Sequence, residues 1–216
     1  MSFDRIAPFY RSIEAIAAGN QLQECRLAHL SGVDAARNIL ILGEGNGRFL
    51  TECRRSLPKG QITCIDSSAK MLELARRRMK NSGQDPGSIQ FIHANALEWR
   101  PAGPVYDLIV THFFLDCFPI KPLETLIRKL SEAATPQAEW LVTDFAMPQS
   151  GLRRLRARII HGLLYRFFGI VSNLPARTLT PPDDFLNAHG FHLRDRITRS
   201  WGLLHSDLWK RGSVGP

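Results

Sequence analysis

One apolar run in this chain ends directly in three alternate glycines. Residues 39–42 are all aliphatic, and Gly43, Gly45 and Gly47 follow them. Glycine lets the backbone turn sharply and leaves room for a ligand where a Cβ would clash. A helix beginning near Gly47 would offer unpaired N–H groups and the positive end of its dipole. Asp66 ends the next apolar run, where a carboxylate can bind a ribose diol. The pattern predicts a nucleotide-like ligand at the carboxyl end of a buried strand.

The rest of the chain alternates between strand and helix patterns. We expect strands at 38–42, 61–65, 88–92, 106–111 and 139–144, with helices at 22–30, from 47 to Pro58, from 67 or 68 to about 83, and at 122–133. Another helix is expected to end near Gly19. This alternation predicts an α/β fold with a doubly wound, mostly parallel sheet. After a short helix from Asp183, the runs 191–198 and 201–209 read as two successive strands, which breaks the alternation.

Four segments in order resemble the motifs of class I S-adenosylmethionine (AdoMet)-dependent methyltransferases. A dinucleotide-binding loop reads G-x-G-x-x-G/A, but here a bulky Arg48 stands at the sixth position. The G-x-G-x-G spacing resembles motif I of the methyltransferases instead. Residues 66–75 resemble the second motif, residues 91–97 the adenine-contacting segment and residues 106–112 the fourth strand. The resemblance covers roughly residues 36 to 145 and extends more loosely to ubiquinone/menaquinone-type and small-molecule methyltransferases.

The resemblance implies a Rossmann-like, doubly wound seven-stranded sheet with an antiparallel C-terminal strand. The length suits a single domain, residues 1–216. Residues 1–35 are expected to form a helical cap on the substrate side. Residues 150–180 are expected to form an inserted, basic, amphipathic helical lid, because apolar and arginine side chains recur there at helical spacing.

The resemblance also implies how AdoMet, and its product S-adenosyl-L-homocysteine, would bind. Asp66 would accept hydrogen bonds from both ribose hydroxyls. The other residues carried over to the cofactor site are Gly43, Glu44, Gly45, Asn46, Gly47, Ser67, Met71, Asn95, Ala96, Leu97 and His112. Asn95 stands where the family often has Asp. The strand before the glycines differs from the family pattern, because Ile41 stands where the family has an acidic residue that steadies the loop. Glu44 is expected to substitute for that residue.

Methyl transfer to a hydroxyl or carbon acid needs a base. His112, Asp116 and Asp144 are the candidates, because all three are expected at or just beyond strand carboxyl ends, where open α/β sheets bind ligands. His112 is preferred, because its reference pKa lies near 6.5. A purely positioning role for His112 stays open. Tyr10 is expected to cap the site, because similar enzymes carry a comparable N-terminal segment.

The charge and the cysteines of the chain indicate its possible binding partners and its cellular compartment. The formal net charge is +8, and no acidic residue lies between Asp144 and Asp183. Such a basic segment suits an anionic substrate, a nucleic acid or an anionic membrane surface. Four scattered cysteines without a C-x-x-C pair, and the absence of metal-ligand spacing, favour a cytoplasmic protein without a metal site. We expect the protein to be cytoplasmic, open to peripheral contact with the inner membrane face.

The segment 113–118 is unusually apolar for an active-site rim and favours a lipophilic or aromatic small-molecule acceptor. RNA or protein methylation is the first alternative, motivated by the charge, although residues 112–115 lack the Asn/Asp-Pro-Pro-Tyr/Phe motif of amino-group nucleic-acid methyltransferases. A non-catalytic methyltransferase-like scaffold is the second alternative. The sequence leaves the acceptor and the oligomeric state open.

Overall fold

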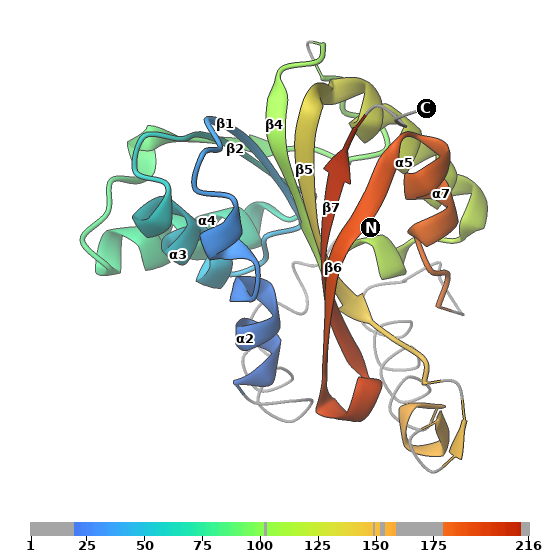
Figure 1. Ribbon diagram of the computed structural model, residues 1–216. Coiled ribbons are helices and arrows are strands. Elements are labelled where there is room, and N and C mark those ends of the chain that lie inside the picture. The colour runs from blue at the N-terminus through green and yellow to red at the C-terminus, as the bar shows by residue number, and fades with distance from the viewer. Residues whose placement is uncertain (1–19, 102, 149, 152–153, 159–178, 213–216) are drawn as a thin grey trace.

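The computed structural model describes residues 20–101, 103–148, 150–151, 154–158 and 179–212. Its centre is a seven-stranded sheet with strand order β3-β2-β1-β4-β5-β7-β6 (Figure 1). The first five strands pair in parallel, and β7 runs antiparallel to both β5 and β6. The predicted α/β, doubly wound sheet with an antiparallel C-terminal strand is confirmed.

The strands are β1 (Asn38–Leu42), β2 (Gln61–Asp66), β3 (Ile89–His93), β4 (Tyr106–His112), β5 (Ala134–Phe145), β6 (Phe191–Arg199) and β7 (Leu204–Arg211). The central strands β1, β2 and β4 are almost entirely buried, as expected of parallel strands covered on both faces. At the amino-terminal edge of the sheet, the Asp107 carboxylate accepts hydrogen bonds from the backbone N–H groups of Arg37 and Asn38. This contact ties the start of β4 to the start of β1.

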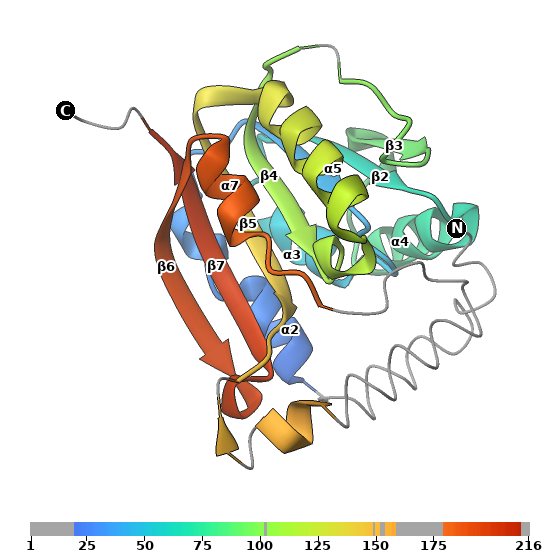
Figure 2. The same cartoon turned by 90° about the vertical axis from the view of Figure 1, so that its right-hand side faces the viewer.

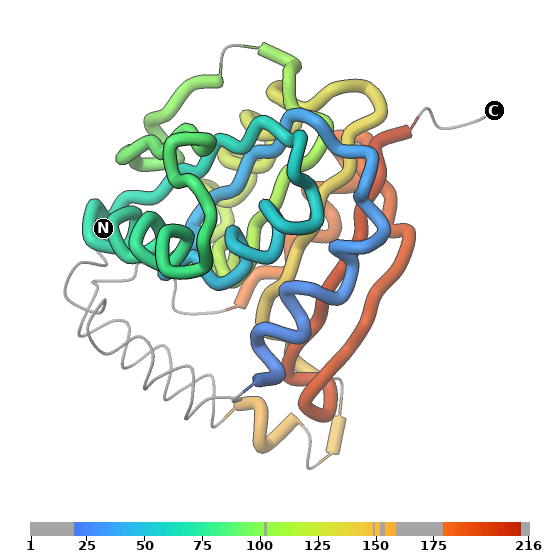
Figure 3. Tube along the Cα trace, turned by 90° about the vertical axis from the view of Figure 1, so that its left-hand side faces the viewer, coloured from blue at the N-terminus to red at the C-terminus, as the bar shows by residue number. Residues whose placement is uncertain are grey.

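Helices cover both faces of the sheet. On one face lie α2 (Gln21–Leu27), α3 (Arg48–Ser56) and α4 (Ala69–Asn81), seen together in Figure 3. On the other lie α5 (Ile120–Ala133) and α7 (Asp183–Ala188), which Figure 2 shows in front of the sheet. Each face of the sheet has its own apolar core, and successive residues of a strand point into opposite cores. Leu108 and Val110 pack with α3 and α4, whereas Ile109 packs with α5 and α7.

Local signals explain where these helices begin and end. Ser68 caps α4 by accepting a hydrogen bond from the backbone N–H of Met71 at 3.2 Å, and Gly83 follows α4 with φ of 72°. Pro58 lies just beyond α3, where its ring cannot continue a helix. The predicted first helix ending near Gly19 lies outside the described residues. Of the predicted lid, only 150–151, 154–158 and 179–180 are described, and 154–158 are helical.

Strand β5 differs from the expectation, because it begins at Ala134 and not at Glu139. Its early residues pair with Tyr106 across a register shift in β4. Pro136 and Gln137 read as a loop in the sequence, and only the neighbouring strand shows that they are extended. The 3-10 turn η5 (Ser200–Gly202) then connects β6 to β7 at the carboxyl edge of the parallel strands.

Candidate active site

The glycine loop connects β1 to α3 through a backbone that only glycine adopts readily. Gly43, Gly45 and Gly47 have φ values of 66°, 69° and 82°. A Cβ on Gly47 would lie 2.7 Å from the Cα of Ala75, so this glycine lets the loop approach α4. A Cβ on Gly43 would lie 2.4 Å from the ring of Phe114, which covers the loop from the side of β4.

Asp66 anchors this loop to the end of β2. Its Oδ2 accepts a hydrogen bond from the backbone N–H of Gly45 at 3.3 Å, and its Oδ1 accepts one from Ser68 at 2.8 Å. The backbone N–H of Gly43 also donates to the carbonyl of Ile65 at 2.9 Å. These contacts hold the loop and the carboxylate in one fixed arrangement at the carboxyl edge of the sheet, where open α/β folds bind ligands.

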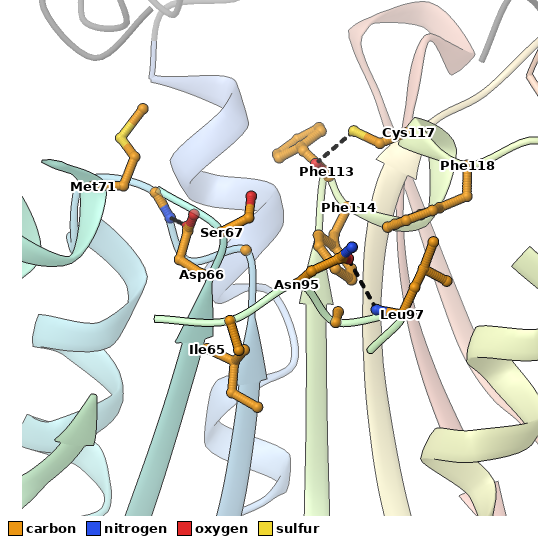
Figure 4. A pocket seen from close by; sticks show the side chains of 14 residues that line it. Ile65, Asp66, Ser67, Met71, Asn95, Leu97, Phe113, Phe114, Cys117 and Phe118 are labelled. Carbon is orange, nitrogen blue, oxygen red and sulfur yellow. Dashed lines mark hydrogen bonds between the residues drawn. The ribbon is translucent and has the colours of Figure 1, made fainter. Parts of the chain in front are cut away.

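A pocket opens between this loop and the end of β4 (Figure 4). Asp66, Ser67 and Met71 form one side, and Asn95 with Leu97 crosses between the two sides. Aromatic and sulfur-containing side chains form the opposite wall: Phe113, Phe114, Cys117 and Phe118. Phe114 and Phe118 stack edge to face, with ring centroids 5.2 Å apart. The pocket is therefore polar on the β2 side and apolar on the β4 side.

Asn95 acts as a turn residue in this structure. Its Oδ1 accepts a hydrogen bond from the backbone N–H of Leu97 at 3.1 Å, and its Nδ2 donates to Glu98 at 2.9 Å. These bonds fix the segment in which Ala96 and Leu97 line the pocket. The ring of His93 lies beside this segment, with 3.0 Å between its Nε2 and the carbonyl oxygen of Ser67.

Glu44 turns back to α3. Its Oε1 accepts a hydrogen bond from the backbone N–H of Leu50 at 2.9 Å, in the first turn of the helix. Burial raises the pKa of Glu44 to about 7, against the opposing effect of this hydrogen bond. Glu44 therefore binds the first turn of α3, and its role as the substitute for the acidic residue replaced by Ile41 stays a prediction.

His112 lies on the other face of β4 from the apolar core of α5. Its ring meets Phe49 of α3 at 4.5 Å in a T-shaped contact, and His112 is not among the residues that line the pocket. Neither ring nitrogen has a hydrogen-bond partner within the described part of the chain. Burial places the pKa of His112 well below its ordinary value. The structure therefore does not bring the preferred base to the pocket.

Two carboxyl groups lie beside the apolar wall. Asp144, at the end of β5, accepts a hydrogen bond through Oδ1 from the backbone N–H of Phe114 at 3.1 Å. Its buried Oδ2 has no partner among the described residues. Asp116 contacts Cys117, with 3.6 Å between Oδ1 and Sγ. Burial raises the pKa of Asp116 to about 6, and burial together with the Asp116 charge places the pKa of Asp144 well above its ordinary value.

Next to this pair, β7 contributes His205 and Asp207 on the same face of the sheet. Nδ1 of His205 lies 2.9 Å from Oδ2 of Asp207, in a geometry short of a hydrogen bond. Arg196 donates to both Asp207 oxygens at 2.8 and 2.7 Å and to Asp183 at 2.8 Å. Burial acts to raise the pKa of Asp207, but the Arg196 and His205 contacts outweigh it and lower that pKa.

The structure thus assembles most of the predicted cofactor residues. Those that line the pocket are Gly43, Gly45, Asp66, Ser67, Met71, Asn95, Ala96 and Leu97. Glu44, Asn46, Gly47, His112 and Asp116 are not pocket-lining residues, and Tyr10 lies outside the described residues. The group of His205, Asp207 and Arg196 was missed. Its signal in the sequence is the alternation of His205, Asp207 and Trp209, which places three side chains on one face of a strand.

The residues present fit AdoMet. A Cβ-free loop approaches the pocket, a carboxylate stands at the end of β2, and an apolar wall faces both. Fold and site together have the features of a class I AdoMet-dependent methyltransferase domain. Residues 39–137 match the family model described as "Methyltransferase domain". The resemblance drawn from the sequence motifs is confirmed.

Three curated proteins with similar sequences are also methyltransferases. Malonyl-[acyl-carrier protein] O-methyltransferase of Halalkalibacterium halodurans is 34% identical over 96 residues, which are 43% of this chain and 34% of that enzyme. Ribosomal RNA large subunit methyltransferase G of Vibrio atlanticus is 35% identical over 72 residues, 33% of this chain and 19% of that enzyme. Ubiquinone/menaquinone biosynthesis C-methyltransferase UbiE of Haemophilus ducreyi is 29% identical over 119 residues, 55% of this chain and 45% of that enzyme. The matches therefore span less than half the length of each relative.

Among solved structures, the mitomycin 7-O-methyltransferase MmcR superposes with a TM-score of 0.70 at 14% identity. The superposition covers 98% of this chain and 61% of that one. At this identity the likeness concerns the fold. No helix among the described residues is long and apolar enough to span a membrane.

Proposed function

We propose that this protein transfers a methyl group from AdoMet to a lipophilic or aromatic small-molecule acceptor. The observation that carries the proposal is the two-sided pocket, with the glycine loop and Asp66 on one side and three phenylalanines with Cys117 on the other. Bound AdoMet supplies an electron-poor sulfonium methyl group. The chain's own part is to align an acceptor with that methyl group and to exclude water.

The apolar wall favours an acceptor with an extended hydrophobic or aromatic surface. Phe113 packs against Phe145 with ring centroids 5.4 Å apart, and Phe114 against Phe118. Such rings stack on aromatic ligands and leave a polar or ionic ligand without partners. An acceptor of this kind dissolves in lipid, so we propose that the protein collects it at a membrane surface.

Asp116 and Asp144 are our candidates for the proton acceptor, in place of His112. Both lie at the carboxyl edge of the sheet beside the wall, and Asp144 carries a buried oxygen without a partner in the described chain. Raised pKa values make these two carboxylates better proton acceptors than exposed ones, so either of them, when ionised, could take up a proton from a hydroxyl or carbon acid. Tyr10 as a cap over this site stays a prediction.

The test is methyl transfer from radiolabelled AdoMet to a panel of phenols, quinones and isoprenoid lipids. We expect an Asp144→Asn variant to bind S-adenosylhomocysteine normally and to lose at least tenfold in kcat on an accepted phenol or quinone. Thr143→Ser, one residue earlier on the same strand, is the matched control. Unchanged kcat in Asp144→Asn would remove the carboxyl pair from the mechanism.

RNA methylation is the alternative, favoured by the charge of +8 and by the ribosomal RNA methyltransferase relative. It predicts that labelled methyl groups enter total RNA and that binding weakens steeply with salt. Label in RNA, with none in the small-molecule panel, would replace our proposal by this one.

A further inference from the structure

The turn η5 presents a tryptophan to solvent on a constrained backbone. Ser200, Trp201 and Gly202 have φ values of 51°, 61° and 84°, and the Trp201 side chain is 72% exposed. Left-handed φ angles are unfavourable for residues with a Cβ and persist only where the surroundings hold them. An indole ring is also costly to leave in water. Neither Ser200 nor Trp201 lines the pocket of the candidate active site.

Two segments fix this turn in place. Arg156 donates from Nη1 to the carbonyl of Ser200 at 3.1 Å, and its guanidinium lies 5.6 Å from the centre of the Trp201 ring. Leu203 accepts a hydrogen bond from Ala146 at 2.7 Å. Pro148 lies beside Gly202, where an added Cβ would be in ordinary van der Waals contact with its Cγ at 3.4 Å. The exit of β5, the helical residues 154–158 and the turn therefore form one surface.

This surface, which we call the basic tip, combines exposed apolar and cationic side chains. Leu155 is 56% exposed and Met147 is 38% exposed. In 154–158 Ala157 is buried, so the other four side chains face outward. Its members are Met147, Leu155 and Trp201 with Arg154, Arg156, Arg158 and Arg199. Glu24 lies across a hollow from Trp201 and is an acidic neighbour.

We infer that the basic tip docks on an anionic lipid bilayer, with Trp201 and Leu155 entering the interface and the arginines contacting lipid phosphates. Tryptophan prefers the membrane–water interface, and arginines near an anionic surface add attraction. Unpaired bases of a nucleic acid would stack on the indole, but the exposed aliphatic side chains of Leu155 and Met147 beside it favour lipid. The turn also lies at the carboxyl edge of the parallel strands, as the pocket does, because β7 begins opposite the end of β5. Docking would therefore bring this edge to the lipid. The inference deepens the proposed membrane collection of the acceptor, but docking itself does not depend on methyl transfer.

The test is flotation of the full chain with vesicles of phosphatidylcholine, with and without roughly one-third phosphatidylglycerol, at about 0.15 M salt. We expect binding only with phosphatidylglycerol, accompanied by a blue shift of tryptophan fluorescence. Trp140 and Trp209 are buried and Trp99 is half-buried beside Tyr106, so a shift that Trp201→Phe removes would report on Trp201. Equal binding to both vesicles, or to neither, would overturn the inference.

Two variants locate the contact. Trp201→Gly removes the ring and relaxes the backbone, because glycine adopts positive φ freely, and should weaken binding severalfold. Trp201→Phe should restore most of it. Arg154→Gln with Arg158→Gln should weaken binding about thirtyfold, at about fivefold for each arginine. Arg55→Gln with Arg128→Gln makes the same charge change on α3 and α5 and should weaken binding far less.

Binding that survives Trp201→Gly and the Arg154/Arg158 pair unchanged would place any membrane contact elsewhere and contradict the inference. Titration with S-adenosylhomocysteine in the absence of vesicles separates this outcome from the proposed function. Cofactor binding without vesicle binding would reject the docking alone, whereas vesicle binding without cofactor binding would reject methyl transfer alone.

Discussion

The two halves of the sheet are built for different tasks. Around β1 and β2, backbone N–H groups and the Asp66 carboxylate satisfy one another, and glycines give the loop its shape. Around β5 and β7, Asp144, His205 and Asp207 are buried together beside the half-buried Asp116, and Asp116 and Asp144 have raised pKa values. Between the halves stands the phenylalanine wall that begins at Phe113, itself at φ of 53°. In the proposed function, the first half holds the cofactor in place and the second takes up the proton.

The largest effect should come from breaking the β7 group. Asp207→Ala leaves Arg196 and His205 facing a buried site without their carboxylate, and should lower the free energy of unfolding by about 3–5 kcal/mol. Chemical denaturation measures this loss. Asp195→Ala, whose side chain is 62% exposed, should cost less than about 0.5 kcal/mol. A small loss of unfolding free energy in Asp207→Ala would mean that the group of Arg196, His205 and Asp207 contributes little to the stability of the second half.

In the first half, Gly47→Ala should be the most damaging small change. The new Cβ would meet the backbone of Ala75 at 2.7 Å while φ stays positive, so we expect a loss of about 2–4 kcal/mol. Gly83→Ala is the matched control, because Gly83 also has positive φ but has open space around it, and should cost about 1 kcal/mol. Equal losses would show that backbone conformation alone, and not the approach of the loop to α4, requires Gly47.

The carboxyl pair predicts a pH dependence. Asp116 has a pKa of about 6 against an ordinary 3.8, so between these values the folded protein binds more protons than the unfolded chain. Its contribution to stability is present at low pH and is lost as pH rises towards 6. Asp144→Asn removes a second buried carboxyl group, whose own pKa is raised by burial and by the Asp116 charge, and should reduce the total loss by about 1 kcal/mol between pH 4.5 and pH 7. If the free energy of unfolding changed with pH equally in the variant and the wild type, Asp144 would have no part in this pH dependence.

The smallest effect should be at Glu44. Glu44→Gln keeps an oxygen for the backbone N–H of Leu50 and removes a charge that burial disfavours, so unfolding temperatures near pH 8 should match or exceed those of the wild type. Glu44→Ala loses the contact with α3 and should cost about 1 kcal/mol. A large loss in the Gln variant would show that the loop needs the charge itself.

The same division explains what the sequence could predict. β1 begins and ends where predicted, because a buried parallel strand reads as a continuous apolar run. Asp66 and the glycines were found because they are local to strand ends. His112 was expected at the ligand, but the alternation of β4 turns its ring to Phe49. The contact between Arg196 and Asp207 joins two strands, and it depends on a register with a bulge between Leu193 and Asp195, which no local pattern encodes.

The most direct test of the central claim is calorimetric titration with S-adenosylhomocysteine, with NAD as the control ligand and Asp66→Ala as the variant. We expect micromolar binding of S-adenosylhomocysteine, no binding of NAD, and at least a tenfold weaker affinity in a folded Asp66→Ala protein. Absence of S-adenosylhomocysteine binding to the wild type, or an unchanged affinity in the variant, would contradict the assignment of this pocket to AdoMet.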